Sequence, residues 1–298
     1  MKQTVGMIGV GVMGTAFTRN LVKAGFNVVG YDPLPEAMER LRVEGGTAMA
    51  SPRAVAEAAP VAFLSLPSTD ALHAAVGTQE GLAAAEAKTI LIETSTLPLA
   101  DKETARDRLA ATGKTLLDCP LSGTGAQALV KDLVVFGSGD LAAYDIALPA
   151  IQAMSRQQFY LGEFGRGSVM KYIANLLVTI HTVSTAEAMV FGMKAGFDPG
   201  VIYDTLKESA GTSRMFQVRG GTMRDEAYDK VASTIKTHCK DLSIIEDFAS
   251  QMHCPTPLFA VASQVYQMSA AQGRELQDTS SVCAAMELAA GFVRPGKA

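Results

Sequence analysis

The sequence predicts an α/β fold: a doubly wound parallel sheet followed by an all-α domain, joined to it by a long helix. In the first half, short β-branched runs alternate with Ala-rich segments whose apolar residues recur every three or four positions. At 162–167 a Gly-rich turn opens a stretch without strand alternation. The 298 residues suit two domains of about 150 each. We therefore expect one domain at 1–164 and a second at 165–298.

The first domain should contain alternating strands and covering helices. Strands are expected at Thr4–Ile8, Asn27–Tyr31, Val61–Leu66, Thr89–Glu93, Thr115–Asp118 and Leu133–Gly137. Helices are expected at Met13–Ala24, Leu34–Glu44, Thr69–Val76 and Ala100–Thr112.

The second domain should be almost wholly helical. Ser168–Ala195 is expected to be one helix, and its apolar run is interrupted by polar residues too often for a membrane span. Further helices are expected at Pro199–Ser209, Lys230–Met252, Pro257–Gln272 and Ser280–Gly291. The segment 211–229 is interpreted as a long loop.

Composition excludes several classes of protein. Hydrophobic residues make up 48% and charged residues 19%, a globular balance. Because 26 Lys and Arg face 30 Asp and Glu, nucleic acid is not an expected partner. The four cysteines lie far apart, as in proteins of a reducing cytosol, and the N-terminus does not resemble a signal peptide. We expect a cytoplasmic protein.

A glycine-rich turn near the N-terminus indicates a dinucleotide site of the Rossmann type. Its residues are Gly9, Gly11, Val12, Met13 and Gly14, which follow an expected strand and open a helix. Asp32 ends the next strand and is placed to accept hydrogen bonds from the adenosine ribose. Its carboxylate would repel a 2′-phosphate, which favours NAD and leaves NADP possible. Leu66, Pro67 and Thr96 close two further strands and are candidates to line the nicotinamide half.

Two other patterns allow both a chemical and a structural interpretation. In the loop 118–126, backbone N–H groups and the Ser122 hydroxyl could hold a small carboxylate, although such a loop is more often a structural turn. Lys171 and Asn175 stand four apart on the long helix and share one face. A solvated lysine beside a packing asparagine would have the same spacing.

Taken together, these motifs resemble those of the β-hydroxyacid dehydrogenase family, over essentially the whole chain. The loop from Asp118 is similar to the family's D-A-P-V-S-G-G, with Thr124 at the second glycine. The stretch from Gly165 resembles G-x-G-x-x-x-K-x-x-N-N, with Ala174 at the first Asn. Lys240-Asp241-Leu242 looks like K-D-L, and the stretch from Gly273 resembles G-x-G-x-x-D-x-S-A, with Glu275 at the second glycine.

The resemblance implies a role for each of these positions. Lys171 would be the general acid or base and Asn175 would orient the substrate. Ser122 and Gly123 would bind the substrate carboxylate, with Thr124 beside them, and Lys240 would lie by the nicotinamide. The change at Thr124 leaves the identity of the substrate open.

The expected function is therefore NAD-dependent hydride transfer to or from a small 3-hydroxy carboxylic acid or its semialdehyde. The second domain would bind substrate and form a homodimer or homotetramer. No metal site is expected. Two alternatives remain: an imine reductase, whose acid usually differs from Lys at position 171, and a non-catalytic NAD(P)-binding regulatory protein. Retention of Lys171 and Asn175 counts against the latter.

Overall fold

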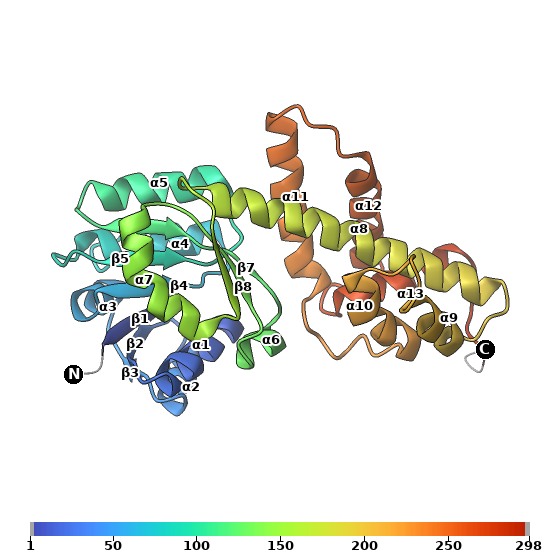
Figure 1. Ribbon diagram of the computed structural model, residues 1–298, viewed down its shortest axis with the longest axis horizontal. Coiled ribbons are helices and arrows are strands. Elements are labelled where there is room, and N and C mark those ends of the chain that lie inside the picture. The colour runs from blue at the N-terminus through green and yellow to red at the C-terminus, as the bar shows by residue number, and fades with distance from the viewer. Residues whose placement is uncertain (1–2, 296–298) are drawn as a thin grey trace. The chain divides into compact units, whose positions relative to one another are not determined.

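The computed structural model describes residues 3–295. It separates into two units, Met1–Lys171 and Tyr172–Ala298, and each is described by itself. Figure 1 shows strands and helices interleaved in the first unit and helices throughout the second. The predicted fold class is confirmed.

The first unit is built on a parallel sheet of six strands in the order β3-β2-β1-β4-β5-β6. The strands are β1 (Thr4–Ile8), β2 (Asn27–Tyr31), β3 (Thr47–Ala48), β4 (Val61–Leu64), β5 (Ile90–Glu93) and β6 (Thr115–Asp118). Five were expected from the sequence, and β3 was missed because two residues carry no alternation. The order steps outward from β1 in both directions, so the carboxyl ends of β1 and β4 flank a topological switch point, where such sheets bind ligands.

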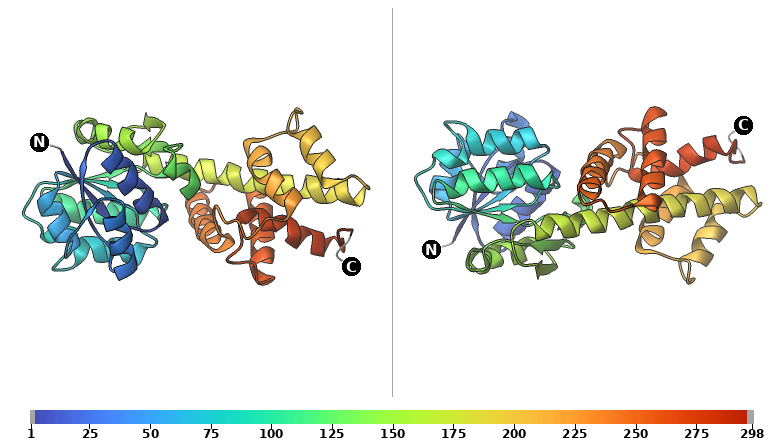
Figure 2. Two further views of the ribbon diagram at one scale, coloured as in Figure 1. Left: turned by 90° about the horizontal axis from the view of Figure 1, so that it is seen from below. Right: turned by 90° about the horizontal axis from the view of Figure 1, so that it is seen from above.

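Helices cover both faces of this sheet, as the two views of Figure 2 show. They are α1 (Val12–Lys23), α2 (Pro35–Val43), α3 (Pro52–Ala58), α4 (Thr69–Gly77), α5 (Leu99–Ala110) and α7 (Leu141–Met154), with a 3-10 turn at Leu82–Ala84. On β4, Val61 and Phe63 belong to one buried cluster, and Ala62 and Leu64 belong to another. Burial of both faces explains why these strands are continuous apolar runs. Helices α3 and α7 were not among the expected helices: α3 has only 7 residues, and α7 contains Pro149, a residue that disfavours a helix interior.

A second, three-stranded sheet corrects the expectation that Leu133–Gly137 extends the main sheet. It has the order β7-β8-β9, with β7 (Leu121–Ser122), β8 (Val134–Gly137) and β9 (Gln157–Tyr160). The connection from β7 to β8 holds only the short helix α6 (Gly125–Leu129), and the two strands pair antiparallel. Helix α7 then provides a crossover long enough for β9 to pair with β8 in parallel.

The second unit is helical. After α8 (Arg166–Lys194) come α9 (Pro199–Leu206), α10 (Arg214–Asp225), α11 (Ile235–Gln251), α12 (Pro257–Ala271) and α13 (Val282–Ala289), with a 3-10 turn at Thr279–Ser281. The expected loop at 211–229 is wrong, since α10 occupies most of it. Its Gly220 and Gly221 lower helix propensity, but a Cβ on Gly220 would collide with the Tyr203 ring, so the helix packs through that glycine.

Helix α11 starts five residues later than expected from Lys230. The Asp278 carboxylate accepts hydrogen bonds from the backbone N–H groups of Ala232 and Ser233, at 2.8 and 3.3 Å, and these hold the segment before the helix as a loop. The Thr234 side chain then caps the helix by accepting from Thr237 N.

Helix α8 is long and apolar enough to cross a membrane by length and composition alone, and 44% of its most apolar window is buried. Tyr172, Val183, Ala186 and Met189 of this helix belong to the hydrophobic core of the second unit. Helix α8 therefore contributes to the packed core of the second unit.

Candidate active site

The three motif glycines of the turn after β1 differ in what surrounds them. Gly9 has φ +86°, and a Cβ there would collide with the Ser65 carbonyl. A Cβ on Gly14 would collide with the carbonyl of Gly9. A Cβ on Gly11 would meet no protein atom within 4 Å. Packing within the protein therefore explains Gly9 and Gly14 but not Gly11, which faces open space that a ligand could enter.

The N-terminus of α1, directly beyond Gly11, has the features of an anion site. Gly11 is the N-cap, no side chain caps the helix, and its first turn holds no acidic residue. The unpaired N–H groups of that turn carry the positive end of the helix dipole. Val12 is exposed and Met13 is half-buried at this start. These residues fit the pyrophosphate of a dinucleotide.

Asp32 lies against the same turn. Its Oδ2 accepts a hydrogen bond from Val10 N at 2.7 Å, and its Oδ1 accepts one from Leu34 N at 3.0 Å. Arg40 of α2 donates to the Val10 carbonyl at 3.3 Å, which brings a guanidinium to the turn. The sequence interpretation missed Arg40, because only the path of α2 returns it to the turn from eight positions beyond Asp32.

Hydrogen bonds connect the segments that follow β4 and β5, beside the glycine-rich turn. Leu64 pairs with Glu93 in the sheet register. Beyond this pair, Leu66 N donates to Ser95 Oγ at 2.8 Å, and Ser95 N donates to Glu93 Oε1 at 2.9 Å. The predicted cofactor positions at Leu66, Pro67 and Thr96 therefore follow strands that are neighbours at the carboxyl edge of the sheet.

The loop at 122–125 packs close to the glycine-rich turn. A Cβ on Gly125 would collide with Val12 Cγ1, and Asn20 Nδ2 of α1 donates to the carbonyl of Ala128 at 2.7 Å. Gly123 has φ +139°, a conformation that glycine adopts most readily. Ser122 is half-buried at the end of β7. The loop and the turn therefore form one surface of the first unit.

Thr124 has a local structural task in this loop. Its side chain accepts from Gln127 N, while its own N–H donates to Gln127 Oε1 at 3.0 Å, which completes a capping box for α6. These bonds occupy the hydroxyl and the N–H of Thr124, the residue that the family resemblance places beside the substrate carboxylate.

Lys171 is half-buried in the first unit, on the opening turns of α8. Asp118, at the end of β6, fixes the start of that helix: its Oδ2 accepts from Ser168 N at 2.7 Å, and its Oδ1 accepts from Ser168 Oγ at 2.8 Å. Gly167 is required here, because a Cβ would collide with the carbonyl of Phe136. Lys171 thus extends from a helix turn that is held by buried hydrogen bonds.

Asn175 lies one helical turn beyond Lys171 and is buried. Its Nδ2 donates to Asp241 Oδ2 at 3.0 Å, and Lys240 Nζ lies 2.9 Å from the other oxygen of the same carboxylate. Asp241 therefore orients two predicted site residues of the second unit. It stood inside the K-D-L motif, but the sequence interpretation gave it no role.

Known proteins match the whole chain. Residues 4–162 match the NAD binding domain of 6-phosphogluconate dehydrogenase, and residues 165–286 match the family described as NAD-binding of NADP-dependent 3-hydroxyisobutyrate dehydrogenase. L-threonate dehydrogenase of Cupriavidus necator is 33% identical over 100% of both chains. Mitochondrial 3-hydroxyisobutyrate dehydrogenase of Bos taurus is 31% identical over 94% of this chain and 86% of its own. The chain belongs to the β-hydroxyacid dehydrogenase family.

Solved structures agree with this membership. The 3-hydroxyisobutyrate dehydrogenase of Salmonella typhimurium has a TM-score of 0.85 and 28% identity, over 95% of this chain and 99% of that one. An imine reductase of Streptomyces aurantiacus shares the fold, with a TM-score of 0.62 and 21% identity over 95% and 99% of the two chains. As a member of the β-hydroxyacid dehydrogenase family, the chain is an NAD(P)-dependent dehydrogenase.

The family's last motif has a structural task in this member. Asp278 is buried, accepts hydrogen bonds from Ser280 N at 2.9 Å and from Ala232 N at 2.8 Å, and forms an ion pair with Arg219 of α10 at 3.1 Å. Burial alone would raise the pKa of this carboxyl, but Arg219 and the hydrogen bonds from Ser280 and Ala232 lower it below its ordinary value.

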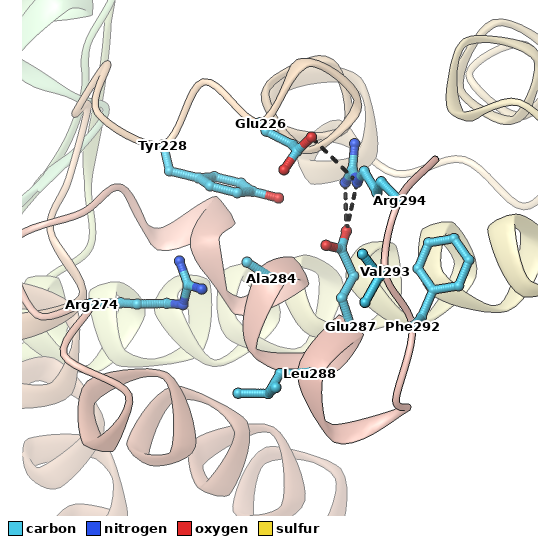
Figure 3. A pocket seen from close by; sticks show the side chains of 9 residues that line it. All are labelled: Glu226, Tyr228, Arg274, Ala284, Glu287, Leu288, Phe292, Val293 and Arg294. Carbon is cyan, nitrogen blue, oxygen red and sulfur yellow. Dashed lines mark hydrogen bonds and ion pairs between the residues drawn. The ribbon is translucent and has the colours of Figure 1, made fainter. Parts of the chain in front are cut away.

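A hollow in the second unit is lined by none of the predicted site residues. It has a volume of about 380 Å³ and is lined by Glu226, Tyr228, Arg274, Ala284, Glu287, Leu288, Phe292, Val293 and Arg294, as Figure 3 shows. Arg294 pairs there with Glu287 at 2.5 Å, so its charge is compensated. Within residues 3–295, no three His, Cys, Asp or Glu side chains form a group that could hold a metal ion.

Proposed function

We propose that this member of the family transfers hydride between NAD and a small 3-hydroxy carboxylic acid or its semialdehyde. The spacing of Lys171 and Asn175, one turn apart on a helix whose start is fixed by Asp118, carries the proposal. The relatives that match over the full chain are named for L-threonate and 3-hydroxyisobutyrate. Both acids carry a hydroxyl on the carbon two positions from the carboxylate.

Residues of the first unit fit the cofactor. The α1 N-terminus would hold the pyrophosphate, Gly11 would allow its approach, and Asp32 would accept hydrogen bonds from the ribose. Leu66, Pro67 and Thr96 would line the nicotinamide half, and the family resemblance adds Lys240 of the second unit to the cofactor-binding residues. The nicotinamide, when bound, supplies the acceptor or donor of the hydride. The preference for NAD over NADP depends on the charge of Asp32.

The chain's own residues would handle the proton and the carboxylate. Lys171, neutral in the oxidation direction, would accept the hydroxyl proton, and its ammonium would return that proton in reduction. Asn175, held by Asp241, has a second amide hydrogen and a carbonyl oxygen to orient the same substrate oxygen. Ser122 and Gly123 would hold the carboxylate, while Thr124 would shape that surface as the cap of α6.

A rate screen tests the proposal. L-threonate, 3-hydroxyisobutyrate and other short hydroxy acids are each offered with NAD and with NADP, and the absorbance of the reduced nicotinamide is followed. We expect turnover with at least one 3-hydroxy acid and a higher kcat/KM with NAD. Turnover of cyclic imines alone would instead identify an imine reductase, and cofactor binding without turnover of any substrate would indicate a regulatory protein.

The Lys171→Ala variant tests the acid/base assignment. With the best substrate of the screen, we expect kcat to fall about 100-fold or more, while affinity for NAD stays within about 2-fold. The matched control is Lys88→Ala, an exposed lysine of the first unit. Turnover at the wild-type rate by Lys171→Ala would refute the assignment.

The same proposal includes a homodimer or homotetramer in the cytoplasm. Phe191, Phe197 and Val201 at the end of α8 and the start of α9 are 78%, 60% and 53% exposed, an apolar surface suited to a second copy. All four cysteines are free thiols, as a reducing compartment maintains them. Light scattering of the purified chain measures the assembly, and a mass equal to one chain would contradict it.

A further inference from the structure

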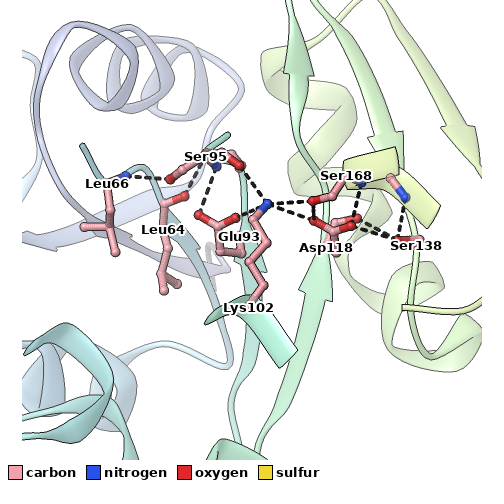
Figure 4. Close-up of polar contacts among 10 residues, drawn as sticks. Leu64, Leu66, Glu93, Ser95, Lys102, Asp118, Ser138 and Ser168 are labelled. Atoms are coloured by element: carbon pink, nitrogen blue, oxygen red, sulfur yellow. Dashed lines mark hydrogen bonds and ion pairs between the residues drawn. The ribbon is translucent and has the colours of Figure 1, made fainter. Parts of the chain in front are cut away.

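A buried lysine connects the ends of two neighbouring strands in the first unit. Lys102, in the first turn of α5, is fully buried, as are Glu93 at the end of β5 and Asp118 at the end of β6. The two carboxylates are paired in the sheet register, and Lys102 Nζ lies 2.5 Å from Glu93 Oε2 and 2.9 Å from Asp118 Oδ1. Figure 4 shows the ammonium between them. We name these three residues the Lys102 cluster.

Each carboxylate of the cluster fixes a different part of the candidate site. Glu93 holds the cofactor side, because its Oε1 accepts from Ser95 N, and Ser95 Oγ accepts from Leu66 N. Asp118 holds the start of α8 through the N–H and hydroxyl of Ser168, three residues before Lys171. The ammonium also donates to the Ser95 carbonyl at 2.7 Å and to Ser168 Oγ at 3.0 Å. It therefore contacts both parts directly.

The charges of the cluster keep it in one arrangement. Burial alone would lower the pKa of Lys102, but Asp118 and Glu93 reverse this effect and hold the pKa above its ordinary value, which favours the cationic side chain. One cation then faces two buried carboxylates. Buried ion pairs contribute little net stability compared with apolar replacements, but they tolerate little displacement because any unpaired charge is costly. The cluster is therefore better suited to fixing geometry than to adding stability.

We infer that Lys102 is a positioning residue for the reaction: through Asp118 and Ser168 it sets the place of Lys171 relative to the strand ends at Leu66 and Ser95. This inference rests on the proposed function, which makes Lys171 the proton acceptor. A shift of about 1 Å in a reacting group can lower a rate by as much as 100-fold. Loss of the Lys102 cation should therefore lower kcat through Lys171.

The test variant is Glu93→Gln/Lys102→Met, which removes one positive and one negative charge and so keeps the net charge of the cluster. The matched control is Arg53→Met/Glu57→Gln, which removes an exposed ion pair of the same unit, 2.9 Å long. Ser168→Ala is a milder third variant that removes only the hydroxyl contacts to Asp118 and Lys102. It serves the same test should the double variant fail to fold.

Two measurements decide the inference. The first is hydrogen exchange of the backbone N–H of Ser168, which donates a hydrogen bond to the Asp118 carboxylate. We expect it to quicken about 10-fold or more in Glu93→Gln/Lys102→Met and to stay unchanged in the control pair. Unchanged protection in a folded double variant would overturn the inference, whatever the activity.

The second measurement is a kinetic cycle with Lys171→Ala. We expect kcat of Glu93→Gln/Lys102→Met to fall about 10-fold or more, with no further fall when it is added to Lys171→Ala. A further 10-fold fall in the combined variant, or wild-type kcat in the double variant, would overturn the positioning role. Wild-type kcat in Lys171→Ala alone would instead remove the proposed acid/base assignment, and exchange at Ser168 would then decide whether the cluster fixes the helix start.

Discussion

The Asp32 carboxylate accepts a hydrogen bond from the backbone N–H of Val10, inside the glycine-rich turn, at 2.7 Å. This bond ties the residue directly after β2 to the turn that follows β1. It holds the carboxylate in one place with lone pairs left for a ligand. Arg40 reaches the carbonyl of the same residue, Val10, so an anionic and a cationic side chain stand at one turn. The charges of Asp32 and Arg40 together set the electrostatic potential at the place where a ribose or a 2′-phosphate would bind.

The first prediction is a change of cofactor preference in Asp32→Ser. Removal of the carboxylate takes away the acceptor for the ribose hydroxyls and the repulsion of a 2′-phosphate, while Arg40 remains. We expect kcat/KM with NAD to fall about 10-fold and kcat/KM with NADP to rise. Asp145→Ser, at an exposed position of the same unit, is the control. An unchanged ratio of the two cofactors would show that Asp32 does not choose between them.

The second prediction separates the glycines of the turn. Gly11→Ala adds a Cβ that meets no protein atom, so the melting temperature should stay within about 2 °C while the Kd for NAD rises about 10-fold or more. Gly14→Ala adds a Cβ against the Gly9 carbonyl, so the melting temperature itself should fall by several degrees. Calorimetry and cofactor titration measure both effects. Equal loss of stability in both variants would mean that Gly11 is also a packing residue.

The main sheet and most of its strands could be predicted, because a strand buried on both faces leaves a continuous apolar run. The short β3 and β7 carry too few residues for any periodicity, and α7 contains Pro149, which disfavours a helix interior. Helix α10 was missed for a comparable reason, since Gly220 and Gly221 lower helix propensity and their packing on Tyr203 is a tertiary contact.

The glycine-rich turn, Asp32 and Lys171 could be found because their tasks depend on local spacing. The Lys102 cluster could not be found from the sequence, because it depends on β5 and β6 being neighbours in the sheet. In the sequence alone, a buried lysine in an Ala-rich helix cannot be distinguished from a solvated lysine. Asp241 and Arg40 were missed for a similar reason. Each contacts a residue that lies 30 or more positions away in the sequence.

The third prediction concerns Asp241→Ala. This variant leaves the buried Nδ2 of Asn175 without its carboxylate acceptor, which costs about 1–3 kcal/mol and frees the side chain to rotate. We expect kcat to fall about 10-fold with the best substrate and the melting temperature to fall by a few degrees. Asp247→Ala, exposed on the same helix, is the control. Full activity in Asp241→Ala would show that Asn175 needs no orienting partner.

The fourth prediction is a pH dependence of stability that originates at Asp278. Because the pKa of this carboxyl is lower in the folded chain than its ordinary value, its ionised form stabilises the fold, fully so above the unfolded pKa of about 3.9. The stabilisation is lost as the pH falls through the lower folded pKa. Asp278→Asn removes the charge at every pH. It also replaces one carboxylate oxygen with an amide nitrogen, and one of the two oxygens now accepts a hydrogen bond from Ala232 N.

The free energy of unfolding of Asp278→Asn, measured by urea titration, should therefore lie below that of the wild type by a constant amount above about pH 5. The gap should narrow as the pH falls below about 4, because the unfolded wild-type chain then binds a proton at this carboxyl, whereas the folded chain, in which Arg219 pairs with it, binds that proton only at lower pH. Asp204→Asn, at an exposed pair on α9, should show a gap near zero throughout. A gap for Asp278→Asn that stays constant down to about pH 2 would mean that hydrogen-bond geometry alone, and not charge, makes this residue stabilising.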